Sequence, residues 1–512
     1  MSSMRSSPLL RSLAMGAASG LLMLLSMPPF RTGLVAWVCL VPLLFAVQIS
    51  RSGWQAFLGG WTCGLVFFGG CVYWTSLVMT MYGGLSRPVA WAVTGLFVAY
   101  LSLFPAVFAW AGSRVRVGFQ AAWLPLSPLI WVACEYLRTT LFTGFPWCLL
   151  GYSQHDLLAA AQVASIGGIY AVSAVVALGS VVVVTAMTRR QTLTLALAGI
   201  VVGTIAWGRY EMSRYPEPGR TLRVGLVQPC TPPIISRSDE SEAAMRQHLA
   251  LTARLHDVDL VVWPENSLLR NVSEFDYFRE RLVRASARAG APILVNSIED
   301  TGWEVFNSTV LVTPAQPKFP RYDKIHLVPF GEYVPLRKAL FFAGKILNEV
   351  SDFSPGRKRV IFDAAGVRVA SAICYEIIYP GEVVAFVRGG AELLVTQSND
   401  SWYGNTGMPH QHQAMAAFRS IENRRYLVRA TNSGISSVVD AAGRTIVATA
   451  LGDVTAVAAE VRPSSRLTLY ARSHDLLARA CVLLSGLLLG ATVARRAGRE
   501  IEPSHIISGG SG

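Results

Sequence analysis

Three residues in the middle of the chain, Glu265, Lys324 and Cys374, carry the groups needed to form and break a thioester: a carboxylate, an ammonium and a thiol. Each follows or flanks a short apolar run, in the strings DLVVWPE, YDKIHLVPF and ASAICYE. Reactive groups at the ends of buried strands lie at a sheet edge, where active sites assemble. A thiol becomes a good nucleophile only when a base or a cation activates it. We therefore expect Glu265 to accept the Cys374 proton and Lys324 to stabilise the thiolate and then an oxyanion.

Each of these residues has a simpler interpretation when it is taken alone. A single cysteine is more often packed in a core than reactive, and Glu265 could be a surface acid at the end of a strand. An isolated lysine such as Lys324 carries no signal of its own. Glu332, eight residues further on, is either a second acid of the site or an ion-pair partner of Lys324 or Arg337. The combination of the three types, rather than any one of them, favours catalysis.

The residues around this triad have the alternating patterns of a globular domain, from residue 216 to about 465. Three segments with helical spacing and charged outer faces predict helices over Glu240–His256, Phe275–Ala289 and Met408–Glu422. The AAG strings at 364–366 and 441–443 predict hairpin turns. Ten apolar runs predict strands: Leu222–Gln228, Asp259–Trp263, Pro292–Ser297, Ser308–Val312, Val360–Phe362, Val367–Ile373, Leu393–Gln397, Leu427–Thr431, Ser436–Asp440 and Val454–Glu460. Apolar strands mixed with helices are typical of a buried α/β sheet.

The composition of the whole chain indicates a membrane protein. Of the 512 residues only 15% are charged, against about 25% in a typical soluble protein, and the mean hydropathy is +0.40. The net charge of +13 is interpreted as membrane-flanking and solvated arginine, because no basic cluster with interleaved aromatic residues predicts nucleic acid binding. Only Cys230 and Cys374 of the eight cysteines lie in the globular stretch, which excludes a disulfide framework. No metal site is expected, since His410 and His412 lack a third ligand.

Eight apolar segments are long enough to be candidate membrane spans. They lie near 9–28, 33–50, 55–80, 88–112, 121–142, 158–186, 192–209 and 475–494. The first resembles a signal peptide but lacks a small-residue cleavage site, so we expect it to be retained. In the fifth, Glu135 and Arg138 either pair on one helical face or mark the outer end of the helix.

The arginines predict the orientation of these spans. If the N-terminus is cytoplasmic, ten arginines lie in inner segments and three in short outer loops. The inner ones are Arg5, Arg11, Arg51, Arg114, Arg116, Arg189, Arg190, Arg495, Arg496 and Arg499, and the outer ones are Arg31, Arg87 and Arg138. The globular domain then lies outside the cytoplasm. The predicted organisation is a membrane domain with seven spans (1–215), a catalytic domain (216–466), a last span (467–496) and a cytoplasmic tail (497–512).

Several longer strings resemble a known family. The order Glu, Lys, Cys is that of the nitrilase superfamily, and the strings around the triad are similar to those of the apolipoprotein N-acyltransferase family. They are Pro264-Glu265, HLVPFGEYVP (326–335), CYEIIYP (374–380), SNDSWYG (398–404) and RATNSGISSVVDAAGR (429–444). The strings FPW (145–147) and GYSQ (151–154) in the membrane portion are similar as well. The resemblance therefore covers nearly the whole chain.

This resemblance implies a nitrilase-like αββα sandwich, outside the cytoplasm, joined to a multi-span helical domain. It implies transfer of an acyl chain from a phospholipid, typically phosphatidylethanolamine, to the N-terminal amine of a diacylglyceryl-cysteine apolipoprotein. It also implies a multi-pass protein of the bacterial inner membrane with a periplasmic catalytic domain, acting as a monomer without a cofactor.

The resemblance further implies roles for single residues. Glu265 is the general base, Lys324 the oxyanion stabiliser and Cys374 the nucleophile. Glu332 matches a supporting acid, and Tyr375 and Glu376 match the neighbours of the nucleophile, with the Tyr375 N–H in the oxyanion hole.

Two positions depart from the family pattern. Asn266 stands where a small hydroxyl residue often follows the catalytic glutamate, and Gln228 is followed by Pro229 and Cys230 rather than by Gly-Asn. Neither departure changes the triad.

Apolar residues near the triad suggest how a lipid could enter. The segment Leu340–Phe353, with Phe341 and Phe342, is too apolar for an ordinary exposed loop. It either packs onto the domain or forms a lid that dips into the outer leaflet. Trp147, Tyr152 and Trp402 are candidates to line the same cleft, since amphipathic aromatic residues suit a membrane boundary.

Two alternative functions stay open at this point. A membrane-anchored nitrilase-type amidase that hydrolyses small amides would keep the triad but use water in its second step. A scaffold or transporter with an inactive domain would need none of the three residues.

Overall fold

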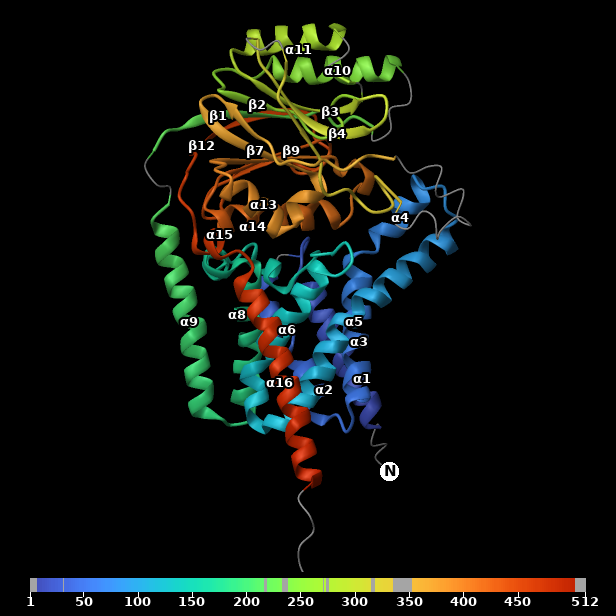
Figure 1. The fold of residues 1–512 in the computed structure, drawn as a ribbon, viewed down its shortest axis with the longest axis vertical. Coiled ribbons are helices and arrows are strands. Elements are labelled where there is room, and N and C mark those ends of the chain that lie inside the picture. The colour runs from blue at the N-terminus through green and yellow to red at the C-terminus, as the bar shows by residue number, and fades with distance from the viewer. Residues whose placement is uncertain are drawn as a thin grey trace, which may run out of the picture.

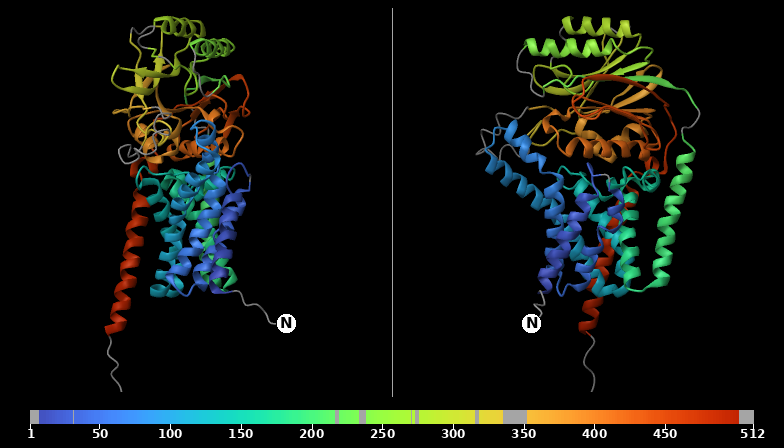
Figure 2. Two further views of the ribbon diagram at one scale, coloured as in Figure 1. Left: turned by 90° about the vertical axis from the view of Figure 1, so that its right-hand side faces the viewer. Right: turned by 180° about the vertical axis from the view of Figure 1, so that it is seen from behind.

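The computed structural model describes residues 7–30, 32–215, 219–232, 238–269, 271–272, 276–314, 318–334 and 352–501. They form a bundle of helices with a layered α/β domain on one end (Figure 1). The N-terminal helix begins, and the C-terminal helix ends, at the opposite end of the bundle (Figures 1 and 2). The two predicted parts are therefore both present, one on top of the other.

The bundle contains most of the predicted spans. Its main helices are α1 (Pro8–Leu25), α2 (Val41–Ile49), α3 (Gly53–Cys71), α4 (Trp74–Met81), α5 (Arg87–Phe119), α6 (Trp123–Thr140), α8 (Ala164–Met187), α9 (Gln191–Ser213) and α16 (Leu476–Ile501). Among the described residues five helices are long and apolar enough to cross a membrane, or six when α3 and α4, bent by 50°, count as one span. The predicted segments 33–50 and 121–142 correspond to a shorter apolar helix (Gly33–Ile49) and to α6, and they remain predictions as spans.

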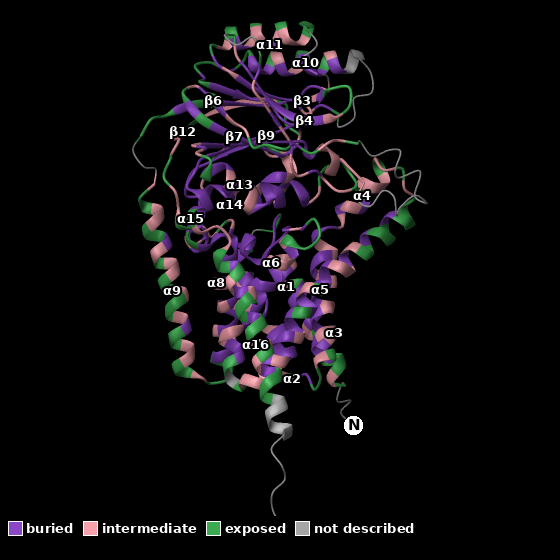
Figure 3. Ribbon diagram, in the orientation of Figure 1, coloured by how far each residue is buried: buried purple, intermediate pink, exposed green. Residues whose placement is uncertain are grey.

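Glycines allow the first helices of the bundle to pack closely. A Cβ atom at Gly16 of α1 would overlap the carbonyl oxygen of Gly59 in α3, and one at Gly60 would overlap that of Pro105 in α5. Without side chains at these positions the helix backbones can approach each other directly, as small residues permit in membrane bundles. The interior of the bundle is correspondingly buried (Figure 3).

The α/β domain consists of two six-stranded sheets between two layers of helices. The strands are β1 (Leu222–Gln228), β2 (Leu260–Val262), β3 (Ile293–Asp300), β4 (Val305–Val312), β5 (Arg321–Asp323), β6 (Ile361–Ala364), β7 (Val367–Ile373), β8 (Leu393–Ser398), β9 (Leu427–Thr431), β10 (Ser437–Val439), β11 (Thr445–Ala448) and β12 (Thr455–Val461). One sheet has the order β12-β1-β2-β3-β4-β5 and the other β11-β10-β9-β8-β7-β6. The central strands β1, β2 and β3 are parallel, as are β7, β8 and β9.

Helices cover the outer face of each sheet. The helices α10 (Ser238–Thr252) and α11 (Asp276–Ala289) lie on the side away from the bundle, whereas α13 (Pro380–Arg388) and α14 (Met408–Asn423) lie between the second sheet and the bundle (Figure 1). Because both faces of the central strands are covered, strands such as β2, β8 and β9 are buried along their whole length. This is the expected αββα sandwich.

All ten predicted strands are present, with ends that differ by a few residues. Two further strands, β5 and β11, and the helix α13 were not predicted. The three residues of β5 and the four residues of β11 are too few to show a period. The hairpin turns at 364–366 and 441–443 are confirmed by the antiparallel pairs β6–β7 and β10–β11.

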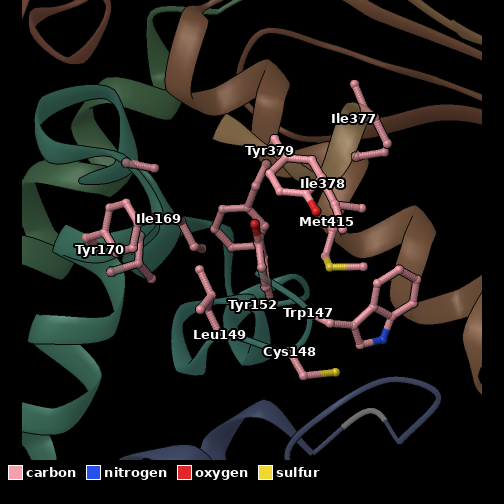
Figure 4. Close-up of a cluster of buried hydrophobic side chains, with 14 of the residues drawn as sticks. Trp147, Cys148, Leu149, Tyr152, Ile169, Tyr170, Ile377, Ile378, Tyr379 and Met415 are labelled. Atoms are coloured by element: carbon pink, nitrogen blue, oxygen red, sulfur yellow. The ribbon is translucent and has the colours of Figure 1, made fainter. Parts of the chain in front are cut away.

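The helix α14 joins the α/β domain to the bundle through buried contacts. Arg419 donates to the hydroxyl of Tyr152 over 2.9 Å and pairs with Glu422. Glu422 in turn accepts the N–H of Ile169 in α8 over 2.9 Å. Apolar side chains from both parts lie around Tyr152, among them Leu149, Tyr170, Ile378, Tyr379 and Met415 (Figure 4). The two parts therefore share one continuous core.

Candidate active site

The triad residues lie at the ends of strands in both sheets. Glu265 follows β2, Lys324 directly follows β5, and Cys374 directly follows β7. Gln397, near the end of β8, connects the two sheets through its side-chain amide. The amide oxygen accepts from the hydroxyl of Thr309 in the other sheet over 2.5 Å, and the amide nitrogen donates to the carbonyl of Trp263 over 2.7 Å. The position of each group is thus decided by the stacking of the two sheets.

Lys324 lies between two carboxylates. Its Nζ atom is 3.3 Å from Oε1 of Glu265 and 2.8 Å from Oε1 of Glu332. The Lys324 side chain is only 1% exposed. Burial by itself would lower the pKa of Lys324, but the two carboxylates outweigh it and hold the pKa well above its usual value. The ammonium is therefore charged at any working pH.

Two asparagines position these carboxylates. The amide Nδ2 of Asn307 donates to Oε1 of Glu265 over 2.9 Å and to Oε1 of Glu332 over 3.0 Å. The backbone N–H of Asn399 donates to the other oxygen of Glu265 over 3.0 Å. The N–H of Val328 donates to the second oxygen of Glu332 over 2.8 Å. Every oxygen of the two acids is held by a named donor, so neither carboxylate is free to rotate.

The Cys374 thiol is electrostatically coupled to the same groups. Burial raises its pKa well above the usual value, the Glu265 carboxylate raises it further, and the Lys324 ammonium lowers it. A thiol in this setting is protonated at neutral pH and needs a base at the moment of attack. The carboxylate of Glu265, beside both groups, is the candidate for that base.

The backbone at Cys374 makes a sharp turn. Its φ angle is +50°, in the left-handed region that non-glycine residues rarely adopt. The strand β7 ends there and a short 3₁₀ helix, η5 (Cys374–Ile378), begins. This turn places the nucleophile at the end of β7 and starts a helix whose second residue is Tyr375. Strain of this kind at a reactive residue is characteristic of active sites.

Glu376 has a structural position rather than a place beside the thiol. One of its oxygens accepts from the N–H of Ile325 over 2.7 Å and from the hydroxyl of Tyr322 over 2.8 Å. The other accepts from the N–H of Ile373 over 2.8 Å. Glu376 thereby ties the loop after Lys324 to the strand that carries the nucleophile. Burial, with a contribution from Glu382, raises its pKa to about 7.

Aromatic residues from the membrane bundle lie against this site. Trp147 donates to Gln411 of α14 over 2.7 Å, and its ring centroid is 5.8 Å from that of His412. His412 in turn contacts the carbonyl of Cys374 over 3.3 Å. Trp74 of α4 packs edge-on against Tyr403, with centroids 5.0 Å apart. The backbone at Cys374 is therefore close to side chains of the membrane domain.

The other predicted lipid contacts differ in their surroundings. Tyr152 is fully buried at the α14 junction, where it accepts from Arg419. Trp402 is partly exposed and packs edge-on against Tyr82, with centroids 4.9 Å apart. Phe341 and Phe342, with the rest of the expected lid up to residue 351, lie outside the described residues. The lipid contact of all these residues stays a prediction.

Loop 145–150 that carries Trp147 is held by Glu135 and Arg138. Arg138 donates to the carbonyls of Phe145 and Trp147 over 3.0 and 2.7 Å, and Glu135 accepts from the N–H of Leu150 over 2.7 Å. Within the described residues the two side chains form no ion pair with each other, so the pairing suggested by their spacing is wrong. Each instead satisfies the polar backbone of an irregular loop, which burial in the bundle demands.

Sequence reasoning missed four residues of the site: Asn307, Asn399, Tyr403 and His412. Two of them, Asn399 and Tyr403, lie in the quoted string SNDSWYG, so a signal was present. His412 was considered only as a metal ligand. Asn307 lies inside β4 with two further buried polar residues, Ser308 and Thr309, and a run of three polar residues beside an apolar run is the signal that could have found it.

Comparison with known proteins agrees with this arrangement. Residues 19–182 match the family described as the apolipoprotein N-acyltransferase N-terminal domain, and residues 223–471 match the carbon-nitrogen hydrolase family. The α/β domain is also similar to a crystal structure of a CN-hydrolase superfamily protein from Xanthomonas campestris (19% identity, 56% of this chain, 99% of that chain, TM-score 0.37).

Two curated relatives extend over both domains. An apolipoprotein N-acyltransferase of Geobacter metallireducens is 35% identical over 92% of this chain and 93% of its own length. One of Methylococcus capsulatus is 33% identical over 96% of this chain and 99% of its own length. With the membrane helices and a nitrilase-type sandwich in one chain, this similarity shows that the chain belongs to the apolipoprotein N-acyltransferase family, as a multi-pass membrane protein with a carbon-nitrogen hydrolase domain.

Proposed function

We propose that this chain transfers an acyl chain from a phospholipid, phosphatidylethanolamine in the first place, to the N-terminal amine of a diacylglyceryl-cysteine lipoprotein. The transfer proceeds through a thioester on Cys374, with Glu265 as general base and Lys324 as oxyanion stabiliser. The protein acts as a monomer in the bacterial inner membrane and needs no cofactor.

This proposal rests on one observation: aromatic side chains of the membrane bundle lie beside Cys374 and its neighbours. The triad belongs to the α/β domain, but Trp74 and Trp147, which pack next to Tyr403 and His412, belong to the membrane bundle. Burial, Cys374 and Asp400 raise the pKa of the same Tyr403, which therefore lies within electrostatic reach of the thiol. A thiol at the junction between a hydrolase-type domain and a membrane bundle suits an acyl donor that stays in the bilayer.

In the first step the Cys374 thiol gives its proton to Glu265, and the sulfur attacks the ester carbonyl carbon of the phospholipid. The oxygen of the tetrahedral intermediate carries a negative charge, which the Lys324 ammonium and the Tyr375 N–H stabilise. The C–O bond then breaks, and the leaving lysophospholipid oxygen takes the proton back from Glu265. A thioester on Cys374 remains.

In the second step the neutral N-terminal amine of the lipoprotein attacks the thioester carbon. Glu265 accepts a proton from the amine as the C–N bond forms. The C–S bond breaks, and the sulfur leaves as a thiolate that regains the proton from Glu265. Exchange of a thioester for an amide is downhill, so no nucleotide is consumed, and two substrates that react in turn give ping-pong kinetics.

The decisive experiment is intact-protein mass spectrometry after incubation with phosphatidylethanolamine in detergent micelles, without an acceptor. The wild type should gain the mass of one acyl chain, and Cys374→Ala should gain none. Addition of a diacylglyceryl lipopeptide should then remove the acyl chain and add it to the peptide. Absence of the adduct would contradict the proposal, and its discharge to free fatty acid at the same rate without the peptide would indicate a hydrolase.

We also infer that the catalytic domain faces the periplasm. Support comes from two arginines on helices that meet near the C-terminal end of α5. Arg116, in the last turn of α5, donates to the carbonyl of Ser50 over 2.9 Å, and Arg495 of α16 donates to that of Gly118 over 2.9 Å. The helix α16 ends at the end of the bundle opposite the sheets (Figure 1). Positive residues concentrate on the cytoplasmic side of membrane proteins. A reporter fused after residue 220 should be active only outside the cytoplasm, and activity in the cytoplasm would overturn the orientation.

A further inference from the structure

Three charged or titratable side chains lie behind the nucleophile and take no part in the steps above. His412 comes from α14, Asp400 from the short 3₁₀ helix η6 (Asp400–Tyr403), and Arg429 from β9. Each is at most 1% exposed. Burial of charged side chains costs folding free energy unless they pair or form hydrogen bonds with one another. The contacts within the cluster therefore indicate which part of the site it positions.

The contacts form a chain that ends on the backbone of Cys374. Arg429 pairs with Oδ2 of Asp400 over 2.7 Å and donates to the hydroxyl of Ser398 over 3.1 Å. Nδ1 of His412 is 3.2 Å from Oδ1 of Asp400 and 3.2 Å from an Arg429 nitrogen. Nε2 of His412 is 3.3 Å from the carbonyl oxygen of Cys374.

These contacts decide where the imidazole carries its proton. A neutral ring with its proton on Nδ1 would donate to Asp400, but it would turn the lone pair of Nε2 toward the Cys374 carbonyl oxygen, and two acceptors repel each other. A neutral ring therefore carries its proton on Nε2, and its Nδ1 accepts from Arg429. If the ring is charged, both nitrogens carry protons. In both states Nε2 donates to the Cys374 carbonyl. Burial and the Arg429 charge lower the pKa of His412 below its usual value, which favours the neutral form. Burial would raise the pKa of Asp400, but the Arg429 charge outweighs it and keeps that carboxyl ionised.

The carbonyl of Cys374 and the N–H of Tyr375 belong to one peptide group. That group is planar and trans, so the C=O and the N–H point in opposite directions. A donor that holds the carbonyl on one side therefore also sets the direction of the N–H on the other side. A hydrogen bond that fixes this peptide is needed, because a non-glycine residue rarely adopts the φ angle of +50° found at Cys374.

We propose that His412 is a positioning residue for the oxyanion hole: its Nε2–H holds the Cys374 carbonyl, and this aims the Tyr375 N–H at the oxygen that becomes negative during acyl transfer. Asp400 and Arg429 hold the ring in that orientation. The inference rests on the proposed acyl transfer through Cys374. It predicts a defect in reactions that pass through an oxyanion and little effect on reactions of the thiol that do not.

Two reactions at Cys374 separate these cases. Acylation by phosphatidylethanolamine passes through a tetrahedral oxyanion, whereas alkylation by iodoacetamide is a direct displacement at carbon. In His412→Ala, and in His412→Leu, which keeps more of the volume, acylation should slow by on the order of 10²-fold, the lower range for loss of an oxyanion donor. Alkylation should change by less than about 3-fold, because the thiol and Glu265 keep their places. Alkylation at the wild-type rate also reports that the site is folded.

A conservative variant and a neighbouring control complete the test. His412→Gln retains an N–H donor near the position of Nε2 and should recover much of the acylation rate. Gln413→Ala changes the next residue of α14, which donates to Ser437 over 2.8 Å, and should acylate at the wild-type rate. Three outcomes would overturn the inference. His412→Ala and His412→Leu could lose acylation and alkylation equally, or they could both acylate at the unchanged rate. The third outcome is a His412→Gln variant that acylates no faster than His412→Ala. Failure of the wild type itself to acylate would instead refute the proposed function.

Discussion

Lys324→Met replaces an ammonium by an apolar side chain of similar length and leaves Glu265 and Glu332 facing each other. Both carboxylates now bind to Lys324, at 3.3 and 2.8 Å, and both accept from the same Asn307 amide. The three side chains together carry a charge of −1. Without the lysine the charge becomes −2 in a site that excludes most water.

The distances set the size of the effect. At an effective dielectric constant of about 20, unit charges at these separations attract by about 5 and about 6 kcal/mol. Desolvation of the lysine offsets part of this attraction, and loss of one partner from a buried pair costs about 3–5 kcal/mol. For a domain of this size that corresponds to a fall of roughly 10 °C in the unfolding temperature.

The loss should depend on pH. Two adjacent carboxylates without a cation repel each other, and protonation of one of them removes that repulsion. Protonation then favours the folded state, so the variant gains stability as the pH falls and loses it as the pH rises. The difference in unfolding temperature between wild type and Lys324→Met, measured in detergent micelles, should be larger at pH 8 than at pH 5.

The double variant Lys324→Met/Glu332→Gln is the matched control. It keeps the apolar side chain but restores the net charge of −1, so it should regain at least half of the lost stability at pH 8 while remaining inactive. If the single variant loses the same stability at pH 5 and pH 8, or if the glutamine gives no recovery, the loss comes from packing and the electrostatic reasoning is refuted.

Three further changes test other parts of the structure. Cys374→Ser should abolish transfer of acyl chains to a lipopeptide, because a serine hydroxyl is too basic for a carboxylate to activate; measurable turnover would contradict a thioester. Glu376→Gln should flatten the decline of unfolding temperature with pH. The raised pKa of about 7 means that stability from the neutral form is present below pH 4.5 and is lost as the pH rises through 7, by up to about 3 kcal/mol. An unchanged pH profile would show that Glu376 does not titrate in this range. Tyr152→Phe removes one of the two acceptors of Arg419, since Glu422 is kept, and should lower stability by about 1–3 kcal/mol; a defect in lipid handling at unchanged stability would instead support the predicted lipid contact.

The amino-acid composition gives the number of arginines but not which of them are buried. The sequence interpretation assigned the excess of positive residues to membrane borders and solvated surface. Arg419, Arg425 and Arg429 are instead at most 1% exposed. Arg425 donates to four backbone carbonyls, including those of Ala391 and Arg466. A guanidinium has five N–H donors in a fixed geometry, so protein acceptors can replace several of its hydrogen bonds to water at once. The composition does not reveal which arginines are buried in this way.

The strands and the chemical groups at their ends could be predicted because both are local properties of the chain. A run of apolar residues such as 367–373 predicts a strand by its period and length, and the polar residue after it must lie at the edge of a sheet. The long apolar helices were predictable for the same reason. Short elements, such as β5 with three residues and β11 with four, were missed because so few residues cannot establish a period.

The order of residue types is enough to show that a carboxylate, an ammonium and a thiol follow apolar runs in a chain rich in membrane-spanning segments. Packing in three dimensions, in contrast, lets one lysine bind two acids and places Asn307 and Asn399 where they hold those acids. It also decided that His412, 38 residues from Cys374, supports the carbonyl of the nucleophile. These contacts join residues far apart in the chain, and their geometry depends on how two sheets and a bundle pack, which no local pattern encodes.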